Sequence, residues 1–423
     1  MLSAFYRETK RKAVFYSGTE KYMYSYEEVL SYVEQEDVKF VRLAFCDIFG
    51  NLKNISISPS ELSRAFEKGI SIDASKMSGL GCESKGSIVL VPDPSTLTLL
   101  PWRPSHGRVI RLICDVKYPD GSAYEFDSRY ILKNAVKAAK EVGIKTNFAA
   151  KYEFYLFKTD EEGNPTKETH DKAGYMDIAP EDKGENIRRE ICLSLEEMGI
   201  YPMYSHHEVG PGQHEIVFRR SDPLSSADNA TNFKIAVRTI AARSGLFASF
   251  MPKPLENEVG NAMHIDIIAK SNDEKDILKS FTAGIIEHIK DITLFLNPTE
   301  QSYHRLGDNI APNIISWSNQ NLPQLIRICN DNEDLDKITL RSPDPQANPY
   351  LAYALLIYAG VDGVKKNLEL CEPIDVNLIE EYDSEYDSLP RLPESLIKAF
   401  RCAKESEFVR SVLPEKIIEA YHS

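Results

Sequence analysis

Short apolar runs separated by turn residues dominate the first part of the chain and predict a segment rich in β-strands. Phe40 to Phe45 is apolar-rich, Asp47 to Gly50 has the composition of a turn, and apolar positions resume from Ile55 to Ile57. A further strand is expected from Ser87 to Val91. Because Pro119-Asp-Gly is typical of a turn, we predict a first domain of residues 1–118 that ends just before it.

Helical periodicity and strand-like runs alternate in the rest of the chain. Apolar residues recur at helical spacing from Ile131 to Val142, from Ile187 to Met198 and from Ala230 to Arg243. Strands are expected between them, from Thr146 to Phe157 and from Ile200 to Ser205. We therefore predict an α+β fold in which residues 119–423 form a catalytic domain whose sheet carries the site.

Size and composition narrow the class of protein. A chain of 423 residues favours two domains, and a formal net charge of -14 argues against a nucleic-acid partner, which needs a basic face. The longest apolar run, Leu351 to Val361, is too short to span a membrane, and no apolar block follows the basic N-terminus. The seven cysteines include no Cys-x-x-Cys pair. We expect a cytoplasmic protein with reduced thiols and no membrane partner.

One stretch, His206 to Glu215, combines two carboxylates with a tight turn. It reads His-His-Glu-Val-Gly-Pro-Gly-Gln-His-Glu, so Glu208 and Glu215 lie on either side of Gly-Pro-Gly. A hairpin of this kind aims both carboxylates at one point, and clustered carboxylate oxygens are the ligands that Mg²⁺ and Mn²⁺ prefer. The alternative is a surface hairpin with solvated acids.

Five further segments contain polar residues that core packing does not explain. They are Lys151-Tyr-Glu-Phe-Tyr-Leu-Phe, Gly260-Asn-Ala-Met-His, Asn297-Pro-Thr-Glu-Gln-Ser-Tyr-His-Arg-Leu, Trp317-Ser to Arg327, and Arg341-Ser-Pro-Asp-Pro-Gln-Ala-Asn-Pro-Tyr. In this order, and together with the hairpin, they resemble glutamine synthetase of the bacterial type. The resemblance runs from about Val38 to the C-terminus.

The resemblance implies a small N-terminal β-grasp-like domain and a catalytic domain with a curved antiparallel sheet flanked by helices. In the family, ATP phosphorylates the γ-carboxylate of glutamate, ammonia displaces the phosphate, and two divalent ions assist. The resemblance also implies a homo-oligomeric ring, in which Asp47 is presented to the neighbouring subunit's active site. A double ring is doubtful, because the terminal arm that locks two rings together has no counterpart before Ser423.

Several site residues of the family are kept. By resemblance, Glu153, Glu208 and Glu215 hold the first ion, Mg²⁺ or Mn²⁺. The other matched positions are assigned to glutamate and acyl phosphate (Gly260, Arg305, Arg341), to the nucleotide (Arg327) and to phosphate (Lys253, Lys337). Catalytic roles then fall to Asp47, Arg305, Arg327 and Arg341, and ATP is a candidate ligand. The alternative for the arginines is ion pairing with nearby acids.

The second ion's ligands are mostly replaced. The matching positions hold Lys151, His264 and Thr339, where the family has glutamate, histidine and glutamate. Because strand residues two apart face the same way, we expect Lys151 to project beside Glu153, so that its ammonium takes the second ion's place and repels a cation. The alternative is that Lys151 turns to solvent. His264 is then expected to be a hydrogen-bonding core histidine, and metal ligation is its alternative role.

The substrate pocket also departs from the family pattern. Ile310 stands where the family has a loop glutamate that binds and deprotonates ammonium, although Asp308 is close enough in sequence to substitute in part. Val259 replaces an asparagine that contacts glutamate, Ala262 replaces a glycine, and Leu322 replaces an arginine that faces phosphate.

Three functional hypotheses follow. The leading hypothesis is a diverged member of the family in which ATP-dependent glutamine synthesis is lost or strongly impaired. The second is an ATP-dependent γ-glutamyl-amine ligase or a weakly active glutamine synthetase. The third is a non-catalytic subunit that senses a small ligand or assembles with an active paralogue.

Overall fold

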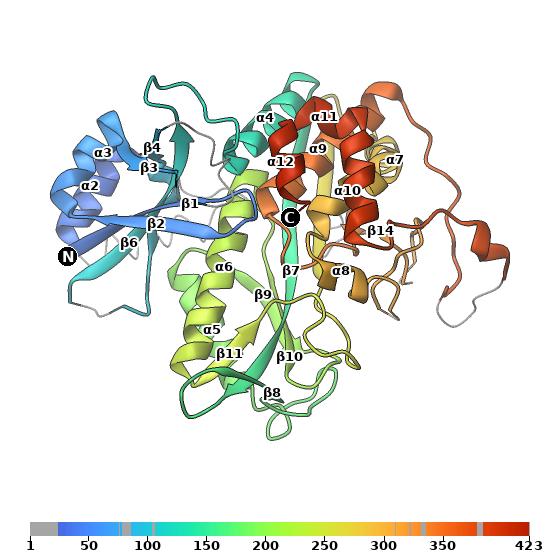
Figure 1. Ribbon diagram of the computed structural model, residues 1–423, viewed down its shortest axis with the longest axis horizontal. Helices are drawn as coiled ribbons and strands as arrows, with labels where there is room; N and C mark the ends of the chain where they lie inside the picture. Colours follow the sequence, from blue (N-terminus) through green and yellow to red (C-terminus); the bar gives the residue numbers. More distant parts are fainter. Residues whose placement is uncertain are drawn as a thin grey trace.

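The computed structural model describes residues 24–75, 77, 86–103, 106–308, 310–320, 323–330, 336–378 and 384–422. The N-terminal unit is a six-stranded sheet in the order β2-β1-β6-β4-β3, with β5 paired to β6 (Figure 1). Strands β1 and β6 run parallel, and the other pairs are antiparallel. The elements of this unit are α2 (Tyr26–Gln35), β1 (Val38–Cys46), β2 (Leu52–Ile57), η1 (Pro59–Glu61), α3 (Leu62–Lys68), β3 (Ile70–Asp73), β4 (Ser87–Pro92), η2 (Pro94–Thr96), β5 (Thr98–Leu99) and β6 (Arg108–Lys117).

The second unit is built on a nine-stranded sheet in the order β13-β14-β15-β12-β7-β10-β9, with β8 and β11 also paired to β7. All pairs are antiparallel except β13 with β14. The strands are β7 (Ile144–Thr159), β8 (Pro165–Thr169), β9 (Pro202–His207), β10 (Gln213–Phe218), β11 (Leu246–Ser249), β12 (Met263–Ser271), β13 (Trp317–Ser318), β14 (Ile326–Asn330) and β15 (Asp336–Leu340).

Helices cover one face of this sheet, and most of them lie in the upper half of the molecule in Figure 1. They are α4 (Ser128–Glu141), α5 (Glu185–Glu197), α6 (Pro223–Arg243), α7 (Leu278–Leu296), α8 (Glu300–Arg305), α9 (Pro349–Lys366), η3 (Ser384–Ser388), α10 (Leu396–Glu405), α11 (Glu407–Val412) and α12 (Glu415–Ala420). The predicted α+β class and the β-grasp-like N-terminal unit are confirmed.

Alternation along β7 separates the core from the site. Tyr152 lies 5.3 Å from Phe233 of α6 between ring centroids, and Phe148 stacks on a tyrosine of α9 at 4.5 Å. These residues bury the helix-covered face of the sheet. Because successive strand residues point to opposite faces, Lys151 and Glu153 project from the other face, where a pocket lies.

A buried guanidinium joins the two units. Arg129 of α4, whose side chain is 3% exposed, pairs with Asp93 at 2.8 Å, with Asp115 at 2.6 Å and with Asp228 of α6 at 3.2 Å. Asp93 and Asp115 belong to the N-terminal unit. Removing the arginine would leave three carboxylates close together in a largely buried place, so this contact fixes how the units pack.

Local capping explains where the helices begin. Asp127 caps α4 by accepting the Arg129 N–H at 3.0 Å, as its position before the apolar stripe predicts. The helix expected to start at Ala230 begins earlier, at Pro223, because Asp222 accepts two N–H groups of the first turn and proline suits that turn. The domain boundary between residues 118 and 119 stays a prediction; β6 ends at Lys117, before the first helix of the second unit.

Helix length bears on membrane contact, and the cysteine environments bear on the state of the thiols. Within the described part of the chain, no helix combines the length and the apolar character that crossing a bilayer requires. Cys46 and Cys114 are buried free thiols, and Cys371 is an exposed one.

Candidate functional site

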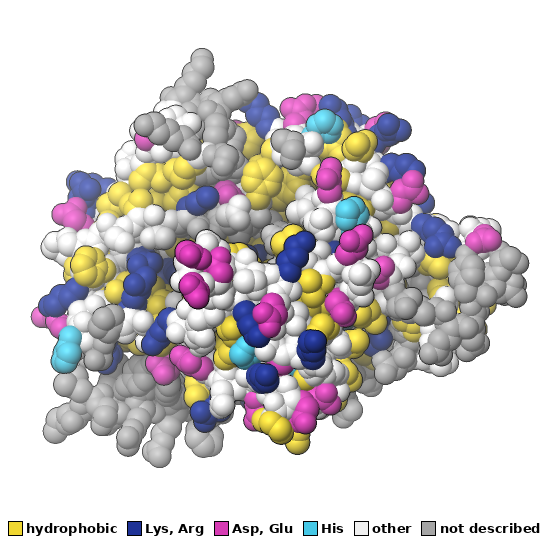
Figure 2. Space-filling view, turned by 60° about the horizontal axis from the view of Figure 1, so that its bottom comes forward, with side chains coloured by type: hydrophobic (Ala, Val, Ile, Leu, Met, Phe, Trp, Pro, Cys, Tyr) yellow, Lys and Arg dark blue, Asp and Glu magenta, His cyan; other side chains and the backbone are white. Residues whose placement is uncertain are grey.

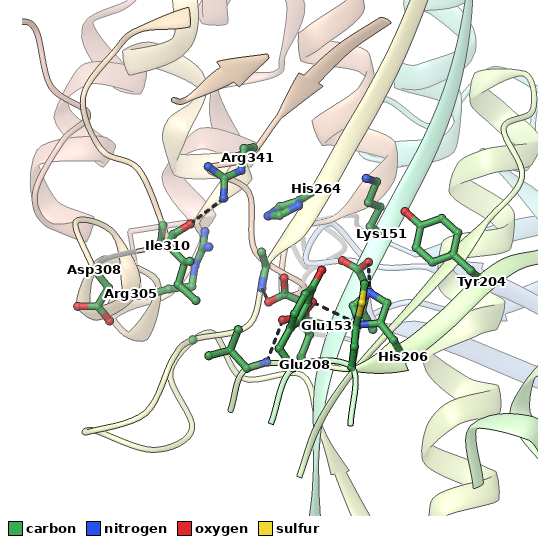
Figure 3. Close-up of a pocket in the computed structure, with 17 residues that line it drawn as sticks. Lys151, Glu153, Tyr204, His206, Glu208, His264, Arg305, Asp308, Ile310 and Arg341 are labelled. Atoms are coloured by element: carbon green, nitrogen blue, oxygen red, sulfur yellow. Dashed lines mark hydrogen bonds and ion pairs between the residues drawn. The ribbon is translucent and has the colours of Figure 1, made fainter. Parts of the chain in front are cut away.

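A pocket of about 440 Å³ opens on the face of the large sheet that the helices leave uncovered (Figure 3). Residues of β7, β9, β10 and β12 line it, together with residues from the segments around Val209 and Ile310. In Figure 3, acidic side chains and His206 lie in the lower part of the view, and Lys151, His264 and Arg341 lie above them. The pocket therefore has an acidic side and a cationic side.

Three carboxylates form the acidic side. Glu153 of β7 and Glu215 of β10 are direct partners in the antiparallel ladder, and Glu208 follows β9 at the turn of the predicted hairpin. Glu153 is fixed by the Ala262 N–H, which donates at 2.7 Å, and by the Gln213 side-chain amide at 3.4 Å. The structure thus brings together the three acids that the sequence assigned to the first ion.

Burial and mutual repulsion make this cluster unfavourable without a cation. Burial raises the pKa of Glu153 well above its usual range, and the charges of Glu208 and Glu215 raise it further. Burial, followed by the charge of Glu215, also raises the pKa of Glu208. A divalent cation among these oxygens would offset both effects, so the residues present fit the ion that the fold implies.

His206 extends the acidic side, although no role was predicted for it from the sequence. Its Nε2 lies 3.3 Å from Glu215 Oε1, and its Nδ1 lies 3.0 Å from the carbonyl oxygen of His207. The hydrogen bond to Glu215 raises the pKa of His206 despite burial. Tyr204, His206 and Glu208 are two residues apart along the same strand direction, and this period of two was the signal that could have placed His206 beside the acids.

Lys151 lies on the same pocket wall as Glu153 and opposite His264 in the strand register. Burial alone would lower the pKa of Lys151, but the attraction of Asp266, with smaller contributions from Tyr204 and Glu215, raises it above its ordinary value. The side chain is therefore a charged ammonium; it lines the pocket and, in Figure 3, lies near Tyr204 and above the acidic side chains.

Asp266 of β12 organises the residues behind Lys151. It accepts a hydrogen bond from the Thr339 hydroxyl at 2.5 Å and pairs with Lys337 at 3.0 Å. The motifs in the sequence predicted no role for Asp266, yet it engages both of these side chains and also attracts Lys151. Lys337, proposed to face phosphate, is neutralised by Asp266 and does not line the pocket.

His264 differs from its expected role as a hydrogen-bonding core histidine. Its ring lines the pocket, is only partly buried, and has no hydrogen-bond partner among the described residues. Burial lowers its pKa well below the usual value, and the nearby cations, Arg341 and Lys151 foremost, lower it further. The ring therefore does not make the expected hydrogen bond within the described residues. His264 also lies close to Glu153 and Glu215, so it stays a candidate ligand by distance.

Two buried arginines form the far wall. Arg305 is 2% exposed and donates to Asn297 Oδ1 at 3.4 Å and to the Ser342 carbonyl. Arg341 donates to the Ile310 carbonyl at 3.3 Å, and its Nη1 is buried without a partner among the described residues. Neither arginine forms an ion pair with an acid within the described residues, so both keep donors for an anionic ligand.

Gly260 allows this arrangement. A Cβ at Gly260 would lie 2.5 Å from Arg305 Cγ and 2.5 Å from the Pro252 carbonyl oxygen. Only glycine lets the backbone approach the arginine this closely. Gly260 therefore has a structural role beside Arg305, and this role is compatible with its predicted role in substrate binding.

Ile310 and Asp308 lie at one side of the pocket mouth. Ile310 is 38% exposed and presents an apolar side chain to the pocket. Asp308 forms an ion pair with Lys253, which also lines a neighbouring cavity of about 980 Å³. Asp308 and Lys253 thus neutralise each other, which weakens the idea that Asp308 replaces the family's loop glutamate and that Lys253 is free to face phosphate.

Three of the remaining assigned residues, Arg327, Val259 and Asp47, do not line the pocket. Arg327 of β14 is half-buried and is not part of the pocket wall; burial lowers its pKa. Val259 contributes its carbonyl to a 2.7 Å hydrogen bond from Tyr155. Leu322 lies outside the described residues. Asp47 is 1% exposed and accepts N–H groups of its own turn, including Asn51 N at 2.8 Å, so a single chain does not bring it to the pocket.

Charges on the outer surface beside the site are mixed. On the face at the bottom of Figure 1, basic and acidic side chains are interspersed, and no continuous basic stripe crosses the described residues of that face (Figure 2). The surface shown there does not resemble a nucleic-acid-binding face.

The fold and site define a two-domain protein with a β-grasp unit and an acid-lined pocket on a large antiparallel sheet. The glutamine synthetase catalytic-domain model matches residues 125–423, and the glutamine synthetase β-grasp-domain model matches residues 37–119. The chain therefore belongs to the glutamine synthetase family, as its motifs predicted.

Individual relatives agree with this assignment. A glutamine synthetase of Methanosarcina mazei is 41% identical over 411 residues, which cover 93% of this chain and 92% of the relative. A glutamine synthetase of Clostridium saccharobutylicum is 40% identical over 413 residues, which cover 94% and 93%. Among solved structures, a GmaS/ADP complex superposes with a TM-score of 0.82 at 25% identity and covers 93% of both chains.

Proposed function

We propose that this protein is a ligand-binding member of the glutamine synthetase family with one divalent-cation site, in which ATP-dependent glutamine synthesis is lost or strongly impaired. The position of Lys151 carries the proposal. Its side chain lines the same pocket as Glu153 and its ammonium is attracted by Asp266, which supports assigning it to the place of the family's second ion.

Electrostatic repulsion makes it unfavourable for the Lys151 ammonium and a second divalent ion to occupy this region together, so the ammonium takes the place of the ion. A divalent cation a few Å from an ammonium is repelled by several kcal/mol, even at an effective dielectric constant of about 20. The ammonium itself supplies one charge instead of two and cannot bridge phosphate oxygens. Charge neutralisation during phosphoryl transfer would therefore be weaker.

The other replaced positions support the same conclusion. The Thr339 hydroxyl is committed to Asp266 and offers no charged oxygen to a cation. Ile310 cannot take a proton from ammonium, and Asp308 beside it is already paired with Lys253. The acids of the first ion and two buried arginines remain, which is enough to bind a cation and a carboxylate or phosphate ligand.

The test is phosphate release with glutamate, ammonium, ATP and Mg²⁺ or Mn²⁺. We expect turnover below about 0.01 per second, whereas ordinary enzymes reach about 1 per second or more. Exchanging Lys151→Glu, Thr339→Glu and Ile310→Glu together should raise the rate about a hundred-fold or more, because preorganised charge at such sites is worth several kcal/mol. The control Lys145→Glu changes the charge of an exposed lysine on the same strand and should leave the rate unchanged. Turnover near 1 per second in the unaltered protein would contradict the proposal.

An ATP-dependent γ-glutamyl-amine ligase is the second candidate, and Ile310 is the observation that favours it. An exposed apolar side chain at the pocket would contact the alkyl part of an amine better than it would ammonium. If alkylamines and polyamines fail to stimulate ATP hydrolysis with glutamate present, this candidate is excluded.

Two further alternatives remain testable by calorimetry. The names of the curated relatives favour a weakly active glutamine synthetase, and the neutralised Asp308 and Lys253 favour a sensing or co-assembling subunit. Binding of glutamate, glutamine or ADP without turnover supports the sensing role, and absence of binding opposes it. Assembly into a homo-oligomeric ring, the contribution of Asp47 across its interface and a cytoplasmic location stay predictions.

A further inference from the structure

Two histidines flank the acid cluster, and they share Glu215. His264 groups with Glu153 and Glu215, and His206 groups with Glu208 and Glu215, with the potential ligand atoms of each group within 4.8 Å of one another. Bound transition-metal ions place neighbouring ligand atoms about 3 Å apart and opposite ones about 4.3 Å apart. Either group would need to contract only slightly to hold an ion.

The charges around the two rings differ in sign. The ring of His264 faces Arg341 and Lys151, and Arg305 and Arg327 also act on it, so a cation beside it meets repulsion. The ring of His206 faces two carboxylates: Glu215 at 3.3 Å from Nε2, and Glu208 at 3.7 Å from Nδ1. A cation is therefore more stable at His206.

Hydrogen bonding also prepares His206 as a ligand. Its Nδ1 lies 3.0 Å from the His207 carbonyl, and because a carbonyl only accepts, Nδ1 carries a proton. The lone pair for a metal is then the one that Nε2, the atom that faces Glu215, gains when it releases its proton. A carbonyl that fixes the ring and its tautomer in this way is the usual support of a metal-binding histidine.

The neighbouring histidines are committed elsewhere. His207 Nδ1 bonds the Glu208 carbonyl at 2.7 Å and Nε2 bonds Asp171 at 2.9 Å, so both nitrogens are used. His214 is fully buried beside the Arg188 guanidinium, 2.9 Å from its Nδ1. Of the histidines around the β9–β10 hairpin, His206 alone combines an acidic environment with an Nε2 directed at the carboxylate cluster.

We propose that His206 Nε2 is a ligand of the cation held by Glu208 and Glu215, which makes the site a mixed nitrogen and oxygen site that binds Mn²⁺ in preference to Mg²⁺. Imidazole nitrogen suits first-row transition ions, whereas Mg²⁺ prefers oxygen alone. The inference rests on the single-cation site of the proposed function. The ion displaces the proton that otherwise lies between Nε2 and Glu215, and that proton is released to solvent.

Pulsed electron paramagnetic resonance of the full-length protein loaded with Mn²⁺ tests this directly. We expect a ¹⁴N coupling from a directly bound imidazole, which changes to a ¹⁵N coupling when histidine is ¹⁵N-labelled. This measurement needs no substitution, so it does not depend on whether a variant folds. Bound Mn²⁺ without a histidine nitrogen coupling would overturn the inference and leave the single-cation site standing. Absence of any bound Mn²⁺ would overturn both.

A matched pair of variants identifies the nitrogen. His206→Gln should abolish the coupling and lower Mn²⁺ affinity about ten-fold or more while changing Mg²⁺ affinity by less than about three-fold. His264→Gln should leave the coupling in place. Loss of the coupling in His264→Gln with retention in His206→Gln would assign the nitrogen to the other side of the pocket and overturn the proposal.

Discussion

The two sides of the pocket come from the same strands and yet carry opposite charge. Glu153 and Lys151 are two residues apart on β7 and point the same way, and each is joined to a different neighbour, Glu215 of β10 on one side and His264 of β12 on the other. On the acidic side three carboxylates outnumber the one neighbouring imidazole, His206, so that side fits a cation. The cationic side already contains its counter-ion, Asp266, which attracts Lys151 and accepts the Thr339 hydroxyl.

This difference shows how one replacement in a strand can change a site without changing its fold. An ammonium in place of a carboxylate keeps the strand geometry, because both side chains are accommodated at the open pocket face. Asp266 attracts the Lys151 ammonium, in addition to its ion pair with Lys337. The pocket is complementary to a cation on one side and to an anion on the other.

The largest effect is expected from removing the acid that both histidine groups share. Glu215→Gln deletes one of the three cluster charges and an oxygen ligand, so Mn²⁺ affinity should fall by about a hundred-fold or more. Isothermal titration calorimetry measures it, with the exposed Glu256→Gln as the control. An affinity within about three-fold of the unaltered protein would show that the ion binds elsewhere.

Crowding the cationic side should destabilise the protein. In Gly260→Ala the new Cβ meets Arg305 and the Pro252 carbonyl at 2.5 Å, so the unfolding free energy should fall by about 1–3 kcal/mol and carboxylate binding should weaken. Gly174→Ala is the matched control, since its closest contact would be an ordinary 3.6 Å to Asp177. Equal stability of the two variants in denaturant titrations would mean that the Arg305 wall is not rigid.

Removing the ammonium should sharpen the contrast between the sides. In Lys151→Met a cation at Glu153 and Glu215 loses a repelling neighbour, and Mn²⁺ affinity should rise about five-fold. Lys145→Met, an exposed lysine on the same strand, should have no effect. A fall in affinity in Lys151→Met would mean that Lys151 organises the acids instead of competing with the ion.

The smallest effect concerns pH and stability without metal. Because the pKa of Glu208 is raised in the folded protein, the folded state holds a proton that the unfolded chain releases, so the unfolding free energy falls as pH rises from about 4.5 through the raised pKa. At pH 7.5 the metal-free protein therefore carries an unfavourable charge. Glu208→Gln should raise its melting temperature by about 1–2 °C at pH 7.5, with a smaller rise at pH 5. If calorimetry shows that Glu208→Gln melts at a lower temperature than the unaltered protein at pH 7.5, the Glu208 charge is stabilising and the prediction is wrong.

Much of the fold was accessible from the sequence because its signals are local. The apolar stripe from Ile131 and the Asp127 cap fixed the first helix of the catalytic unit, and the Gly-Pro-Gly turn fixed the hairpin. Motif resemblance then supplied the family. Period two along β7 also predicted the direction of Lys151 relative to Glu153, which the pocket wall repeats.

Other parts of the site depended on contacts between distant segments. Asp266 and Thr339 meet across β12 and β15, Asp308 meets Lys253 from another loop, and the cations around His264 come from β7, β14, the end of α8 and the residue after β15. No local pattern encodes these pairings, because the paired residues are far apart in the sequence and meet only in the folded protein. His206 is a different case, because the period of two along β9 is a local pattern that could have placed it beside the acids.

The sequence by itself determined the family, the two-unit organisation and the three acids of the pocket, because each depends on residue identity and spacing. It also predicted that the second ion's carboxylates are replaced. Only the tertiary structure decided which charges neutralise one another. Lys337 was predicted to contact phosphate, but it pairs with Asp266. His264 was predicted to be a core residue, but it lines the pocket near several cations. Electrostatic interactions act through space, so their balance is set by the fold rather than by order along the chain.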